Sequence, residues 1–105
     1  MDIAEGQMWR CEIKAFRNTE DAMTVTPLNG DNQSPLIFTH LFFRQNFKKT
    51  GEKDRYYARI KIIEIKQCSA LVQFNQHEAC YIGLPILQQL LTHATLIDPD
   101  EKTPA

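Results

Sequence analysis

The N-terminal part of the chain alternates between apolar and polar residues, a pattern typical of a β-strand with one buried face. The alternation runs from Gln7 to Phe16. The apolar side, which we expect to face a core, holds Trp9, Cys11 and Ile13, and the other side holds Met8, Arg10, Glu12 and Lys14. A polar turn at 17–21 and a Thr/Val-rich segment at 22–28 predict that the first two strands form a hairpin.

The middle of the chain is less regular. Residues 29–35 contain Asn-Gly and a final proline, which indicate a loop. The apolar, aromatic segment 36–43 fits a third strand or a short buried helix, and we favour the strand. Residues 46–54 form a charged segment that we expect to be an exposed loop.

The longest predicted strand covers residues 55–66. Tyr56, Ala58, Ile60 and Ile62 share one face. The pair Ile62-Ile63 then shifts the apolar phase, which predicts a bulge or a sharp bend at this point.

The rest of the chain is predicted to form short elements separated by turns. A tight turn at 66–67 leads to a strand at 68–74, a polar turn at 75–78 and a short strand at 79–82. Pro85 and leucines at helical spacing predict a short helix over 85–93, and 95–97 fits a closing strand. Residues 98–105 are acidic and end in Pro-Ala, as expected of a flexible tail.

These elements predict one mainly β domain over residues 1–97. A chain of 105 residues, 43% hydrophobic and 24% charged, has the size and composition of one globular unit. We expect a small barrel of about five to seven strands with one short C-terminal helix. The pattern leaves open whether the hairpin at 7–28 belongs to the barrel or is added to it.

Residues 54–91 resemble the Tudor and SH3-like family of small barrels. An aromatic residue precedes Ala-Arg-Ile (58–60), Val-Gln-Phe (72–74) leads into a polar turn, and Leu-Pro-Ile-Leu (84–87) matches the family's helical turn. Tudor domains bind methylated arginine or lysine in an aromatic cage, where rings attract the cation. By this resemblance Tyr56, Phe74 and His77 would form the cage walls, with Phe43 or Phe47 as a further wall. Glu78 and Ala79 stand where the family has Gly-Asn. The alternative is that Tyr56 and Phe74 fill the core.

Charge is unevenly distributed along the chain. The formal net charge is −1, yet residues 43–66 hold eight basic and three acidic side chains. Cations interleaved with aromatic rings are typical of nucleic-acid binding, since cations contact phosphates while rings stack on bases. The candidate residues are Arg44, Lys48, Lys49, Lys53, Arg55, Tyr57, Arg59 and Lys61. Alternation places Arg55, Tyr57, Arg59 and Lys61 on one strand face. The opposing interpretation is a solvated strand face with internal ion pairs.

No catalytic or metal-binding motif stands out. Cys11, Cys68 and Cys80 are odd in number and irregularly spaced, which does not suggest a disulfide framework. His77 and Cys80 form the one close His/Cys pair, whereas a zinc site usually needs two such pairs. The sequence has no phosphate-binding glycine loop and no nucleophile elbow.

We therefore expect a non-catalytic binding module without a metal or other cofactor. The abundance of aromatic residues favours a protein or peptide partner that binds in a groove of the barrel. Nucleic acid, bound through residues 43–66, is the alternative. No secretory signal or membrane-spanning run is apparent, so we expect a cytoplasmic chain, or a nuclear one in a eukaryote.

Overall fold

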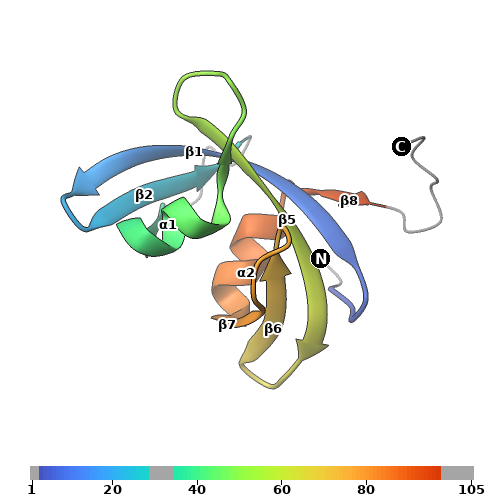
Figure 1. Ribbon diagram of the computed structural model, residues 1–105. Coiled ribbons are helices and arrows are strands. Elements are labelled where there is room, and N and C mark those ends of the chain that lie inside the picture. The colour runs from blue at the N-terminus through green and yellow to red at the C-terminus, as the bar shows by residue number, and fades with distance from the viewer. Residues whose placement is uncertain (1–2, 29–34, 98–105) are drawn as a thin grey trace.

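Eight strands form one curled antiparallel sheet, and two short helices lie against it (Figure 1). The computed structural model describes residues 3–28 and 35–97, and these counts refer to those ranges. The strands are β1 (Met8–Thr19), β2 (Ala22–Pro27), β3 (Leu36–Thr39), β4 (Lys48–Lys49), β5 (Arg55–Ile65), β6 (Ser69–Phe74), β7 (Cys80–Gly83) and β8 (Thr95–Ile97). The helices are α1 (His40–Asn46) and α2 (Leu84–Leu91). Most of the predicted loop at 29–35 and the predicted tail at 98–105 lie outside the described residues.

The sheet has the order β3-β2-β1-β5-β6-β7. Its curl makes a half-barrel. β3 and β7 end this order, while β4 pairs with β5 and β8 pairs with β1 outside it. The prediction of a mainly β, small barrel-like domain is confirmed. The described part has one strand and one helix more than the sequence pattern led us to expect.

β1 is the strand on which the sheet is built. One of its edges pairs with β5, from Met8 opposite Lys61 to Lys14 opposite Arg55. Its other edge pairs first with β8 and then, from Ile13 onward, with β2. The N-terminal hairpin is therefore part of the same sheet as β5, β6 and β7.

The apolar faces of the strands and helices meet in one core. Trp9, Cys11 and Ile13 are buried as predicted. Ala58, Ile60 and Ile62 of β5 are buried on the same side of the sheet, as are Ala70, Val72 and Phe74 of β6. α2 contacts β1, β2, β6 and β7 and buries Leu87, Leu90 and Leu91.

The bulge predicted at Ile62-Ile63 is confirmed. The register between β5 and β6 shifts between Ile62 and Glu64. Ile63 is the extra residue, and 40% of its surface is exposed. The backbone N–H of Gly6 donates to the carbonyl of Ile62 at 2.7 Å, so the segment before β1 reaches the same bend.

The strand predicted over 36–43 is only half right. Leu36–Thr39 forms β3, and the chain then turns into α1 at His40. Thr39 caps this helix, since its hydroxyl accepts the backbone N–H of Phe42 at 3.1 Å. The helix turns Phe42 and Phe43 toward the core, whereas a continuing strand would place them on opposite faces.

Two other parts of the chain differ from the sequence pattern. β1 continues through the expected turn to Thr19, with an irregularity in its pairing with β2 after Arg17. The two-residue strand β4 lies within the expected loop 46–54, and its partner is β5. Figure 1 shows the remaining part of that loop projecting beyond the sheet.

Cys11 lies in the first half of β1 with 1% of its surface exposed. Burial raises the pKa of its thiol from 9.0 to about 12, because the thiolate is poorly solvated there. Below pH 9 the thiol is protonated in both the folded and the unfolded chain, so its contribution to the free energy of unfolding is fully present. Between pH 9 and 12 only the unfolded chain releases the proton, and stability falls.

We therefore expect the free energy of unfolding to decrease between pH 9 and 11 by about 1 kcal/mol per pH unit from this thiol. Urea unfolding at several pH values measures the decrease. The variant Cys11→Ala lacks the thiol and serves as the control, since it retains the contributions of lysine and tyrosine. Equal pH slopes for the two proteins would contradict the prediction.

Candidate functional site

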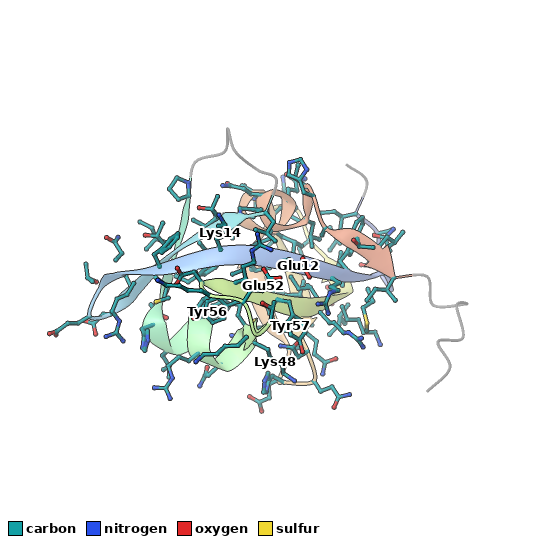
Figure 2. All side chains as sticks on the ribbon, turned by 90° about the horizontal axis from the view of Figure 1, so that it is seen from above. Glu12, Lys14, Lys48, Glu52, Tyr56 and Tyr57 are labelled. Carbon is teal, nitrogen blue, oxygen red and sulfur yellow. The ribbon has the colours of Figure 1, made fainter. Side chains whose placement is uncertain are left out.

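The outer face of β1, β4 and β5 gathers basic side chains from three strands. In an antiparallel ladder, residues directly opposite each other share a face. Tyr57 lies between Glu12 of β1 and Lys48 of β4, and Arg59 lies opposite Arg10. We call this surface the basic face, with the cations Arg10, Lys14, Lys48, Arg55, Arg59 and Lys61. Figure 2 shows Glu12, Lys14, Lys48 and Tyr57 on these neighbouring strands.

Arg10 and Tyr57 form the centre of the basic face. The guanidinium carbon of Arg10 lies 4.3 Å from the centroid of the Tyr57 ring, a cation–π contact. Arg10 also lies 3.3 Å from a carboxylate oxygen of Glu12. Both Arg10 and Tyr57 are half-buried. The pair is thus held in place on the sheet by neighbours on two sides.

A surface pocket of about 330 Å³ opens beside this pair. It is lined by Met8, Arg10, Lys48, Tyr57, Arg59, Asn75 and Gln76. The lining combines three cations with one aromatic ring. Such a combination suits a ligand with anionic groups and a flat ring.

Asn75 holds one wall of the pocket. Its backbone has φ 55°, in the left-handed region. Its side-chain oxygen accepts the backbone N–H of Arg59 at 3.1 Å, and its side-chain nitrogen donates to the carbonyl of Asn46 at 2.8 Å. Asn46 in turn donates to the carbonyl of Phe42 at 2.8 Å. Asn75 therefore ties the strand that carries Arg59 to the C-terminal end of α1.

The basic face carries more positive charge than its carboxylates offset. Glu12 pairs with Arg10, and Glu52 pairs with Arg55 at 2.5 Å. Within residues 3–28 and 35–97, no ion pair involves Lys14, Lys48, Arg59 or Lys61. A net charge of −1 for the chain is compatible with this local excess, because surface potential depends on where the charges lie.

The structure divides the basic residues predicted from the sequence into separate groups. Lys48, Arg55, Tyr57, Arg59 and Lys61 lie together on the basic face. Arg44 and Lys49 line a different pocket, next to Tyr56. Lys53 is exposed in the loop between β4 and β5.

Sequence reasoning missed Arg10 and Lys14 as members of the basic face. The alternation in β1 indicates that they point away from the core. Their neighbours across the sheet depend on the register between β1 and β5, which the alternation leaves undetermined.

Tyr56, Phe74 and His77 do not share an open pocket. Phe74 is 0% exposed, because it ends β6 on the core side of the sheet. Its ring packs against Phe42 and Phe47, at centroid distances of 5.5 and 5.7 Å. The walls expected from the Tudor resemblance are therefore not assembled into a cage here.

The other two expected walls lie apart from Phe74. Tyr56 is half-buried and packs edge-on against Phe43 at 4.7 Å. His77 is exposed and lines another pocket, of about 390 Å³, together with Phe42, Gln45, Asn46, Glu78, Ala79 and Cys80.

The cysteines differ in their surroundings. Cys68 is exposed, and Cys80 is partly buried, which raises the pKa of its thiol. No hydrogen bond joins Cys80 to His77 in the described part of the chain. Among the described residues, no three His, Cys, Asp or Glu side chains gather as metal ligands would. Neither described helix has the length and hydropathy needed to span a membrane.

Comparison with protein-family models, with curated proteins and with solved structures found no match to this chain. The resemblance to Tudor and SH3-like barrels therefore stays a prediction from the sequence pattern. The candidate site is defined by the geometry of the basic face alone.

Two substitutions of Asn75 test whether its bonds and its backbone conformation hold the wall of this pocket. Asn75→Gly loses both side-chain bonds, and we expect it to lower the free energy of unfolding by about 1–2 kcal/mol. Asn75→Ala loses the same bonds but keeps a Cβ at positive φ, so we expect it to be about 1 kcal/mol less stable than Asn75→Gly, which has no Cβ. Chemical denaturation measures both values. Equal stabilities of the two variants would show that the backbone conformation imposes no constraint.

Proposed function

We propose that this chain is a non-catalytic binding module whose ligand is single-stranded nucleic acid. The observation that carries the proposal is the basic face, where cations from three strands surround the Arg10–Tyr57 pair and most of them form no ion pair among the described residues. Cations on such a surface contact phosphates, and the exposed part of a ring or guanidinium stacks on a base.

The spacing of the β5 side chains supports an extended ligand. Arg55, Tyr57, Arg59 and Lys61 recur at every second residue, so neighbours stand about 6.6 Å apart along the strand. Lys14 and Lys48 widen this line on either side of β5. A flexible single strand can follow such a line, and its unpaired bases can reach the stacked pair.

A peptide in an aromatic groove, which the sequence favoured, has less support. Phe38, Phe42, Phe43, Phe47 and Phe74 pack on one another or on Tyr56. Phe43, Phe47 and Phe74 are buried, so most of their ring surface is used in this packing and is not exposed along a groove that a peptide could occupy. A protein partner on the basic face is the competing outcome of the experiment below.

The proposal is tested with fluorescently labelled single-stranded DNA and RNA of mixed sequence. We expect saturable binding at 50 mM salt that weakens steeply by 200 mM, because bound phosphates displace counterions. Replacing Arg59 by glutamine should reduce the slope of log affinity against log salt by about 0.7, the value for one phosphate contact with a single strand. Lys66→Gln removes the same charge beyond the end of β5 and should leave the slope unchanged.

Tyr57 gives a second readout in the same experiment. Tyr57→Leu should weaken binding by about 1–3 kcal/mol, the usual contribution of one stacked base, while Tyr57→Phe keeps the ring and most of the affinity. Absence of binding at 50 mM salt would refute the proposal. Equal effects of Arg59→Gln and Lys66→Gln would show that the basic face is not the site.

A further inference from the structure

A second cationic pocket lies on the opposite side of the β4–β5 ladder. It has a volume of about 310 Å³ and lies between α1, β2, β4 and β5. Its lining residues are Met23, His40, Phe43, Arg44, Phe47, Lys49 and Tyr56. Lys49 and Tyr56 are direct partners in the ladder, as are Lys48 and Tyr57. Since consecutive strand residues point to opposite faces, this pocket shares no side chain with the basic face.

The charged side chains at this pocket are all basic. Arg44 and Lys49 line it, and Arg17 lies beside the lining residue His40. The Nη2 of Arg17 is 2.9 Å from the Nε2 of His40, so the guanidinium donates to the imidazole. A guanidinium that uses an imidazole as its acceptor keeps its full positive charge.

Among residues 3–28 and 35–97, no carboxylate oxygen lies within ion-pair distance of these cations. The ion pairs of the described chain involve Arg10, Arg55 and Lys66, and none of the cations at this pocket. Arg17, Arg44 and Lys49 are exposed at its rim. Cations that lie at one pocket and are not engaged in ion pairs suit the binding of a multiply charged anion.

The floor of the pocket is apolar and partly aromatic. Met23, Phe43 and Phe47 are buried, and Tyr56 is half-buried. Phe43 packs edge-on against Tyr56 at 4.7 Å and stacks with Phe47 at 5.3 Å. These contacts fix the rings, so a ligand meets a preformed surface and loses little free energy in ordering it.

We infer that this pocket binds a phosphate monoester attached to a flat apolar group. The phosphate lies among Arg44, Lys49 and the Arg17–His40 pair, and the apolar group lies on Tyr56 and Met23. A phosphate monoester carries close to two negative charges at neutral pH and offers three strong acceptor oxygens, which matches several convergent donors. This site is independent of the proposed function, because it has its own residues on its own face.

The inference is tested by NMR titration with phenyl phosphate at constant ionic strength. We expect saturable shifts of the ring resonances of His40 and Tyr56. Inorganic phosphate should produce the shifts of His40 with weaker affinity, because it lacks the ring. Arg44→Gln and Lys49→Gln should each weaken binding of phenyl phosphate about tenfold, as expected for loss of one charge-assisted bond.

Two matched variants serve as controls. Lys66→Gln removes one exposed charge just beyond the C-terminal end of β5, whereas Tyr56 of the pocket lies near its start. Arg59→Gln removes one charge from the basic face. Both should bind phenyl phosphate as the unmodified chain does. Arg59→Gln weakens only oligonucleotide binding, so failure of one site is distinguishable from failure of the other.

Two outcomes would overturn the inference. One is a shift that stays linear with phenyl phosphate concentration and shows no saturation. The other is an equal affinity of Arg44→Gln, Lys49→Gln and Lys66→Gln for phenyl phosphate. The substituted side chains are exposed, so each variant is expected to fold, and its spectrum without ligand verifies this.

Discussion

The antiparallel pairing of β1 with β5 is the constraint on which the rest of the structure depends. A single register between these strands determines which side chains are neighbours on each face of the sheet. On the inner side it brings together the pairs Trp9–Ile60, Cys11–Ala58 and Ile13–Tyr56, and on the outer side Arg10–Arg59 and Lys14–Arg55. The free energy gained by burying the apolar pairs thus holds like charges side by side on the opposite face. A slip of one residue would expose the core and disperse the charges.

The sequence predicted those features that depend on alternation within one strand. The buried face of β1, the exposed row on β5 and the bulge after Ile62 all follow from a period of two and its interruption. The neighbours of each strand do not follow from alternation, because pairing is a long-range property. For this reason Arg59 was identified as a candidate while its partner Arg10 was not.

The aromatic residues show a different limit of sequence reasoning. A cage wall and a core residue have the same composition, since both are rings beside apolar strands. Whether these rings form a cage or part of the core depends on the segment that forms α1. The sequence pattern left open whether this segment is a strand or a helix. Once Thr39 caps this helix, Phe42 reaches the ring of Phe74 and Phe43 reaches that of Tyr56. Rings that a cage would have exposed are then part of the core.

The short strand β4 separates the chemistry of the two faces. Its residues Lys48 and Lys49 are adjacent in sequence, yet their ladder partners Tyr57 and Tyr56 point to opposite sides of β5. Each lysine therefore joins a different set of cations, Arg59 and Arg10 in one case and Arg44 in the other. Because the packed sheet lies between them, one flat ligand cannot contact both sets. Substitution of either lysine thus changes the potential mainly at its own face.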